Sequence, residues 1–157
     1  MNSKTETPTG HLTLDDLTVG QIFHSGTYQL NKEEIIAFAG QFDPQPYHTD
    51  EKAAADSFFK GLAASGWHTA AITMRLIVLT TPILGGLVGA SADLSWPRAV
   101  RPGDTLHVVS EVTKIEPSRS RPDRGIATIR SITKNQNEET VQILTSRLVV
   151  PRRVSSG

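Results

Sequence analysis

A short polar stretch, residues 42–50, holds the side chains of this sequence that are best suited to acid–base chemistry. It contains the carboxylate of Asp43 and the imidazole of His48, with prolines at positions 44 and 46. Because each proline fixes φ and biases the residue before it away from the helical region, we expect Asp43 and Gln45 to be extended and the segment to be a stiff loop. A carboxylate and an imidazole held at a fixed separation can share a water, remove one proton and return another. Taken singly, each residue has a simpler interpretation, as a surface histidine and as an aspartate that starts a turn.

Helical patterns flank this loop on both sides. Asn31 is the expected N-cap of an apolar-striped helix that ends near Gly40 and delivers the chain to Asp43. After His48, Asp50 is placed to cap a short helix over residues 51–55. We expect the pair Phe58–Phe59 to anchor this helix in the core.

A longer helix follows, with Ser65 as its expected N-cap and Pro82 just beyond its end. Apolar residues recur along it with the spacing i, i+3, i+4, i+7, which predicts one buried face. The residues of this stripe are Trp67, Ala70, Ala71, Met74, Ile77 and Val78.

The remaining segments alternate between apolar and polar residues, as half-buried strands do. The predicted strands cover residues 20–30, 88–96, 105–115, 126–133 and 141–150. One long helix followed by a run of strands predicts an α+β fold, in which the helix lies on one face of a curled antiparallel sheet. The exposed edges of such a sheet favour association of two chains. We expect residues 1–10 to form a flexible arm and residues 11–157 to form a single domain.

The composition excludes several other classes of protein. The 16 basic and 16 acidic side chains cancel and form no long run of either sign, so a nucleic-acid partner is not expected. Cysteine is absent, which rules out disulfides, thiolate metal sites and a cysteine nucleophile. Residues 70–90 are apolar but interrupted by threonines, an arginine and a proline, so no membrane span is expected. With no signal-like apolar stretch in residues 1–10, we expect a cytoplasmic protein.

The loop also carries a family resemblance, from Asp43 to Asp50. The sequence Asp-Pro-Gln-Pro-Tyr-His-Thr-Asp resembles the D-x-N-P-x-H-x-D signature of the MaoC-like and (R)-specific enoyl-CoA hydratases, which adopt the hotdog fold. Ser65-Gly66 at the start of the long helix, and Arg-Pro-Gly-Asp at residues 101–104, also match that family. The resemblance runs from about residue 12 to residue 151. One departure is Gln45, where the family commonly has asparagine.

The resemblance implies a function and a set of roles. Asp43 and His48 would be the catalytic pair, and the backbone N–H of Gly66 would bind the thioester oxygen. The substrate would be an acyl-CoA or a related thioester, CoA being part of that substrate, and neither a metal nor a redox cofactor would be needed. The enzyme would work as a homodimer.

Several further residues are candidates for binding the substrate. We expect Gln45, Ser65, Trp67 and His68 to contact it, although His68 has an equally simple role in packing. Trp67, Met74 and Trp96 could line an acyl tunnel, or could simply be core. Arg98, Arg101, Arg152 and Arg153 are candidates for the CoA phosphates. The remaining histidines, His11, His24 and His107, are expected to be structural or solvated.

The expected activity is therefore that of a hydro-lyase, which interconverts 2-enoyl and 3-hydroxyacyl thioesters by addition or loss of water. Asp43 and His48 would serve as base and acid, and they titrate as a unit, so neither is assigned as the sole base. The start of the long helix, with Gly66, would stabilise the enolate oxygen. Two alternatives stay open. One is an acyl-CoA thioesterase of the same fold, and the other is a non-catalytic subunit that binds acyl thioesters.

Overall fold

A computed structural model describes residues 10–153 of the chain. The expected N-terminal arm, apart from Gly10, lies outside these residues, as do residues 154–157. The elements follow in the order η1 (Leu14–Asp16), β1 (Ile22–Gln29), α1 (Lys32–Phe42), α2 (Pro46–Thr49), α3 (Glu51–Ala55), α4 (Gly66–Thr80), β2 (Val88–Ser95), β3 (Thr105–Pro117), β4 (Arg124–Lys134) and β5 (Thr140–Pro151).

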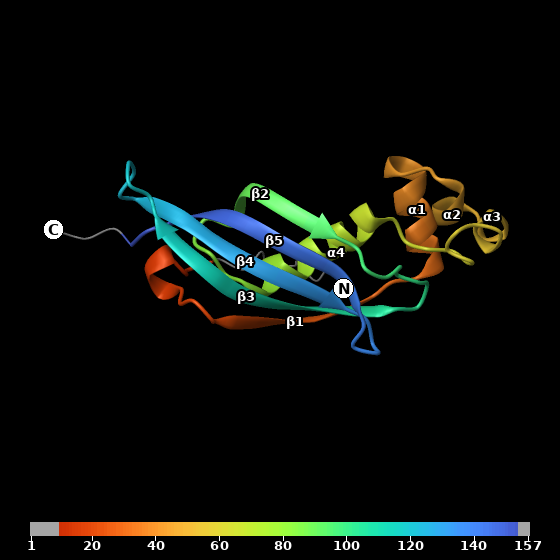
Figure 1. Cartoon of the computed structure of the whole chain (residues 1–157), viewed down its shortest axis with the longest axis horizontal. Coiled ribbons are helices and arrows are strands. Elements are labelled where there is room, and N and C mark those ends of the chain that lie inside the picture. Colours follow the sequence, from red (N-terminus) through yellow and green to blue (C-terminus); the bar gives the residue numbers. More distant parts are fainter. Residues whose placement is uncertain (1–9, 154–157) are drawn as a thin grey trace, which may run out of the picture.

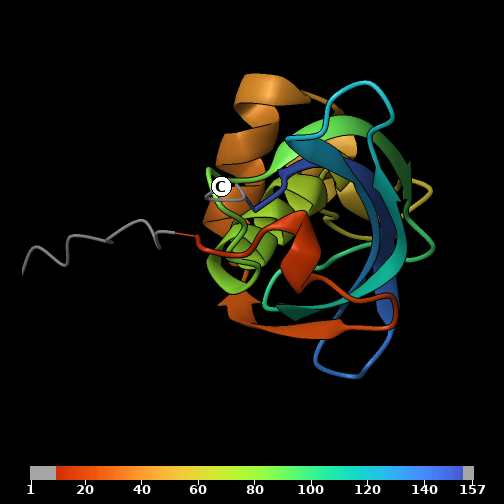
Figure 2. The ribbon, with the colours of Figure 1, turned by 90° about the vertical axis from the view of Figure 1, so that its left-hand side faces the viewer.

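The strands form one antiparallel sheet in the order β1-β3-β4-β5-β2. The sheet curls around α4, which lies along its concave face (Figures 1 and 2). This is the predicted α+β architecture, with a long central helix wrapped by a curled sheet. Helices α1, α2 and α3 gather at one end of the molecule, beside the N-terminal end of α4 (Figure 1).

The predicted helix caps are confirmed. The side chain of Asn31 accepts a hydrogen bond from Glu34 N at 2.8 Å, and that of Asp50 accepts from the backbone of residues 52 and 53. Ser65 accepts from Trp67 N at 3.2 Å and starts α4. The first of these helices passes through Gly40 and ends only at Phe42, so its predicted end was two residues short.

The loop after α1 differs in part from the expectation. Asp43 and Gln45 are non-helical, as their prolines require. Pro46, however, starts the helical turn α2, which carries His48. Proline suits the first position of a helix, since its φ is already helical and the missing N–H has no partner there. The sequence predicted that His48 lies on a loop, so this helical turn was missed.

The buried face of α4 differs from the predicted stripe, of which only Ile77 is buried. The residues that face the core are His68, Thr69, Ile72, Thr73, Leu76 and Ile77. Trp67, Met74 and Val78 are instead 59%, 44% and 40% exposed. The helix thus has two apolar faces, and the buried one includes Thr73, whose hydroxyl finds hydrogen-bond partners inside. Thr73 Oγ1, for example, lies 2.7 Å from Thr133 Oγ1 of β4.

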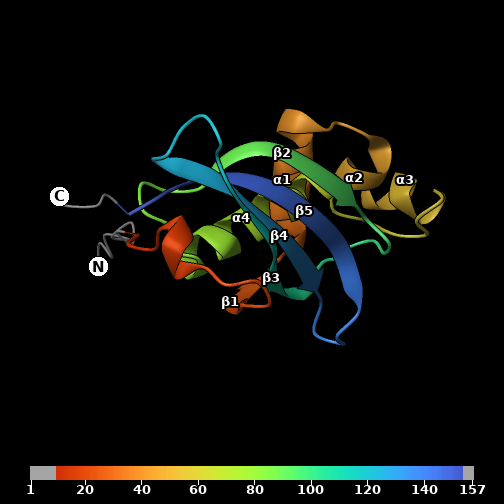
Figure 3. The same ribbon diagram turned by 60° about the vertical axis from the view of Figure 1, so that its left-hand side comes forward.

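Two other predicted burials are also wrong. Phe58 is 92% exposed and does not anchor α3 in the core. Strand β2 was expected to be half-buried, but nearly all of its residues are exposed because it lies at the edge of the sheet (Figure 3). Its outer edge has no neighbouring strand in the described chain. Within residues 10–153, no helix is long and apolar enough to cross a bilayer.

Candidate active site

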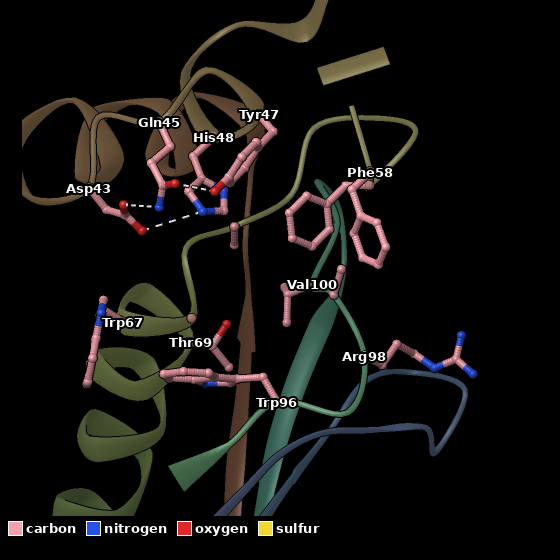
Figure 4. Close-up of a pocket in the computed structure, with 14 residues that line it drawn as sticks. Asp43, Gln45, Tyr47, His48, Phe58, Trp67, Thr69, Trp96, Arg98 and Val100 are labelled. Atoms are coloured by element: carbon pink, nitrogen blue, oxygen red, sulfur yellow. Dashed lines mark hydrogen bonds and ion pairs between the residues drawn. The ribbon is translucent and has the colours of Figure 1, made fainter. Parts of the chain in front are cut away.

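Asp43 and His48 face each other at the end of the molecule where the short helices lie. Asp43 ends α1, and His48 lies on the turn α2. The distance between Asp43 Oδ2 and His48 Nε2 is 3.4 Å, and the side chain of His48 is only 6% exposed (Figure 4). The proline-rich segment therefore brings the two predicted catalytic groups together.

The hydrogen bond made by Nδ1 of His48 determines which ring nitrogen carries a hydrogen in the neutral imidazole. His48 Nδ1 lies 2.6 Å from the carbonyl oxygen of Ala63. A carbonyl can only accept, so Nδ1 carries a hydrogen and donates it. In the neutral ring, Nε2 is then the bare nitrogen, and it points toward Asp43. This contact with Ala63 could not be seen in the sequence, since it depends on how the segment before α4 passes behind His48.

Both carboxylate oxygens of Asp43 accept hydrogen bonds. Ser65 Oγ donates to Oδ2 at 2.7 Å, and Gln45 Nε2 donates to Oδ1 at 2.6 Å. Burial raises the pKa of Asp43, but these two hydrogen bonds and the nearby His48 lower it by more, so that the pKa lies below its ordinary value. Asp43 is therefore a carboxylate at neutral pH. Ser65 links it directly to the first turn of α4.

Gln45 is itself oriented by a neighbour. The hydroxyl of Tyr47 donates to Gln45 Oε1, on the opposite side of the amide from Asp43 (Figure 4). The longer reach of glutamine, compared with the asparagine common in the signature, spans this distance. Tyr47 is a contributor to the site that the sequence interpretation missed.

The backbone N–H of Gly66 opens α4 and has no acceptor among the described residues. It stands at the positive end of the helix dipole, next to Ser65. Glycine is needed here for a reason that the sequence did not show. A Cβ at this position would lie 2.7–2.9 Å from ring atoms of Trp96.

A cavity of about 440 Å³ connects these groups. Asp43, His48 and Gly66 line it together with Trp67 and Trp96 (Figure 4). The lining also includes residues for which the sequence gave no signal of function, namely Phe58, Phe59, Ala64, Thr69, Ala99 and Val100. The cavity is thus largely apolar, with Asp43 and His48 at one wall.

His68 and Met74 are not among the residues that line this cavity. The ring of His68 stacks on Phe38 of α1 with centroids 4.4 Å apart, and the residue is buried. Burial lowers the pKa of His68, against an opposing effect of Glu34. The structure therefore supports the packing interpretation of His68.

The candidate arginines separate into two groups. Arg98 lines the cavity, and its side chain is 57% exposed while paired with Glu139 at 3.0 Å. Arg101 instead donates to the carbonyl oxygens of Gly61 and Leu62 and holds the loop before α4. Arg152 and Arg153 pair with Asp15 and Asp16 and belong to the opposite end of the molecule (Figure 1).

The other histidines also lie outside the cavity. His107 is 3.4 Å from Glu138, and His11 and His24 are exposed. In the part of the chain that the structure describes, no three His, Asp or Glu side chains cluster as metal ligands would.

The curled sheet around a central helix is the hotdog fold, and Asp43 and His48 lie at the N-terminal end of that helix. Comparison with known proteins is consistent with this assignment. The chain belongs to the family of MaoC-like domains, which matches residues 16–135.

Three relatives illustrate the similarity. The MaoC-like dehydratase from Rhodospirillum rubrum is 55% identical, with a TM-score of 0.89 over 92% of this chain and 99% of that one. The (R)-hydratase from A. caviae, involved in PHA biosynthesis, is 27% identical, with a TM-score of 0.68 over 87% of this chain and 98% of that one. The uncharacterized protein YdeM of Bacillus subtilis (strain 168) is 35% identical over 82% of this chain and 91% of its own length.

Proposed function

We propose that this protein is a hydro-lyase that adds water to, or removes it from, the 2,3 bond of an acyl-CoA thioester. One observation carries the proposal. Asp43 and His48 approach to 3.4 Å on the wall of a cavity that Gly66 also lines, and the N–H of Gly66 has no acceptor within residues 10–153. The reaction needs an acid–base pair and a donor for the developing enolate oxygen, and these three groups supply both.

The proton arrangement of the pair suits a bound water. Asp43 is ionised, and the Nδ1–H of His48 is used by Ala63, so in the form with a neutral imidazole Asp43 and His48 Nε2 are both acceptors at the cavity wall. A water bound on the cavity side of the pair, within reach of both atoms, can donate one hydrogen to each. In hydration, its oxygen forms the bond to C3, one of its protons passes to the pair, and a proton from the pair is delivered to C2. The negative charge that develops on the thioester oxygen is stabilised by the Gly66 N–H, and dehydration follows the same steps in reverse.

The substrate in this proposal has two parts, the acyl group and the CoA carrier. The step balances with water and thioester alone, so the proposal includes no further cofactor. Arg98 is the candidate for the phosphates of the CoA carrier, since its guanidinium is exposed beside the cavity. It would have to exchange its pairing with Glu139 for a phosphate.

A homodimer is part of the proposal. Strand β2 exposes an unpaired edge, and the exposed face of α4 carries Trp67, Met74 and Val78. A second copy of this chain could pair its β2 with this edge and cover the apolar face, which removes both features from water.

The Met74→Glu variant tests the homodimer and should be a monomer by analytical ultracentrifugation. Glu33→Gln, on the exposed side of α1, should remain a dimer.

The activity is tested with purified protein and crotonyl-CoA, by recording the loss of enoyl absorbance and the release of free thiol together. Asp43→Asn and His48→Ala should each lower hydration by about 10²–10⁴-fold, as expected for removal of an acid or base. The matched control is His107→Ala, a histidine outside the cavity, which should keep full activity. Thermal melts of all variants establish that they fold.

Each other outcome has a defined meaning. Full activity in Asp43→Asn and His48→Ala contradicts the assignment of the site. Release of one free thiol for each substrate consumed identifies a thioesterase, because hydration releases none. Tight binding of acyl-CoA without turnover across a panel of thioesters identifies a binding subunit.

A further inference from the structure

The cavity has two chemically different ends. At one end Arg98 and Ala99 also line a neighbouring hollow of about 260 Å³, whose walls are mostly polar. At the other end lie Gly66 and Thr69 of α4 and the indole of Trp96 (Figure 4). A thioester has a polar carrier arm and an apolar acyl chain, so the arm fits the end with Arg98 and the acyl chain fits the end with Trp96. This assignment rests on the proposed function.

Trp96 closes the end of the cavity next to α4. Its six-membered ring is in such close contact with Gly66 that no Cβ could be added there without reaching 2.7 Å from the ring. The same indole meets Trp67 edge to face, with centroids 5.3 Å apart. These two contacts place the indole directly against the first turn of the helix.

A buried hydrogen-bond network holds the indole in this position. Trp96 Nε1 donates to Gln142 Oε1 at 2.9 Å, and Gln142 Nε2 donates to Thr73 Oγ1 at 3.0 Å. Thr73 in turn shares a hydrogen with Thr133. The side chains of Gln142, Thr73 and Thr133 are fully buried. Rotation of the indole away from Gly66 would leave Gln142 Oε1 unsatisfied in the core, which is costly.

We propose that Trp96, fixed by Gln142, is the residue that limits the length of the acyl chain, so that the protein selects thioesters of short acyl groups. A short enoyl group fits between the acid–base pair and the indole. Each further methylene must displace a ring that is held on three sides, by Gly66, Trp67 and Gln142. Neither the family signature nor the catalytic pair determines this preference.

The test compares four-carbon and eight-carbon 2-enoyl-CoA substrates. Wild-type protein should show a higher kcat/KM for the four-carbon substrate. Trp96→Ala should raise the ratio of eight-carbon to four-carbon kcat/KM by at least about tenfold, since single methylenes in a pocket already change specificity by that order. Trp96→Phe, which retains most of the packing, should raise the ratio less and serves as the test if the alanine variant does not fold.

Phe58→Ala is the matched control, because it removes another aromatic ring from the lining without opening the end beside α4. It should leave the ratio between the two substrates unchanged, whatever its effect on each rate. A wild-type protein that prefers the eight-carbon substrate, or an unchanged ratio in Trp96→Ala and Trp96→Phe, would overturn the proposal.

Binding measurements test the role of Trp96 independently of the proposed hydratase activity. Calorimetric titration with saturated butyryl-CoA and octanoyl-CoA reports the size of the acyl site without any turnover. If no thioester is hydrated but butyryl-CoA binds at least about tenfold more tightly than octanoyl-CoA, and Trp96→Ala removes the difference, the hydratase assignment fails and the role of Trp96 stands. If neither thioester binds, or both bind equally to wild-type protein, the role of Trp96 is refuted.

Discussion

The hydroxyl of Ser65 donates a hydrogen bond to Oδ2 of Asp43 at 2.7 Å, while the same hydroxyl accepts from the backbone of Trp67 at 3.2 Å. One side chain therefore caps α4 and orients the carboxylate. The sequence pointed to the cap through the Ser-Gly start of the helix. The bond to Asp43 couples the position of the helix N-terminus to the acid–base pair.

Ser65→Ala should lower kcat/KM and move its pH profile. A hydrogen bond to a charged group contributes about 1.5–3 kcal/mol, which corresponds to about tenfold to a hundredfold in rate. This bond favours the ionised form and helps to lower the pKa of Asp43, so its loss raises that pKa. The acid limb of the profile, which belongs to the pair as a unit, should move to higher pH.

Loss of the cap should also reduce stability by about 1 kcal/mol. Urea unfolding measures this part of the effect, and assays well below the midpoint separate it from the kinetic part. Ser65→Thr keeps a hydroxyl and should restore most of the activity. An acid limb that stays in place in Ser65→Ala would show that the bond does not tune Asp43.

Gln45 should act on the same carboxylate from the other oxygen. Its amide donates to Asp43 Oδ1 at 2.6 Å and is oriented by the hydroxyl of Tyr47. Gln45→Leu should therefore shift the acid limb to higher pH, in the same direction as Ser65→Ala. Tyr47→Phe should give a smaller shift in that direction, since the amide remains but loses the group that orients it.

The measurement is again the pH dependence of kcat/KM, with Gln41→Leu as the matched control. Gln41 is an exposed amide on α1 and does not line the cavity. Gln45→Asn tests the role of reach, because the shorter side chain cannot span from Asp43 to Tyr47. If Gln45→Asn and Gln45→Leu both keep the wild-type profile, the amide has no part in setting the ionisation of Asp43.

The sequence was sufficient for those features that depend on local patterns. Asn31, Asp50 and Ser65 cap helices as predicted, and β3, β4 and β5 largely follow the predicted alternation, whereas the edge strand β2 does not. The spacing of Asp43 and His48 and the family signature also predicted that these residues form a pair, and the structure brings them together. These features are set by residues close in sequence, where capping chemistry and periodicity act directly.

The features that were predicted wrongly depend on distant parts of the chain. The buried face of α4 includes Thr73, whose hydroxyl is satisfied only because β4 and β5 bring Thr133 and Gln142 beneath it. An apolar-stripe rule therefore chose the other face, which this chain leaves exposed. In the same way, the need for glycine at position 66 arises from Trp96, thirty residues further along the chain.

Gly66 and Trp96 should be energetically coupled. A Cβ at residue 66 would lie 2.7 Å from the indole, so Gly66→Ala should lower the free energy of unfolding by about 1–3 kcal/mol, as overpacking does. In a Trp96→Ala background the indole is gone, and the same substitution should cost much less. Urea unfolding of the four proteins of this double-mutant cycle gives the coupling energy. Equal costs in the two backgrounds would show that the contact does not restrict residue 66.

His68 should make stability depend on pH. Burial holds the pKa of His68 in the folded chain below its ordinary value of about 6.5, whereas the unfolded chain titrates near that value. Above about pH 6.5 both states hold a neutral ring and the group contributes no pH dependence. As the pH falls through that value, the unfolded chain binds a proton that the folded chain does not, so the free energy of unfolding decreases.

His68→Phe should therefore flatten the pH dependence of stability below pH 6.5. The substituted ring can keep the stack on Phe38, and it removes a buried Nδ1 that has no partner among the described residues. The loss in wild-type protein should approach about 1.4 kcal/mol for each pKa unit that separates the two states. Urea unfolding at pH 7.5, 6.5 and 5.5 measures the difference, with the exposed His24→Gln variant as the control. If wild-type protein and His68→Phe lose stability in parallel over this range, His68 is not the group responsible.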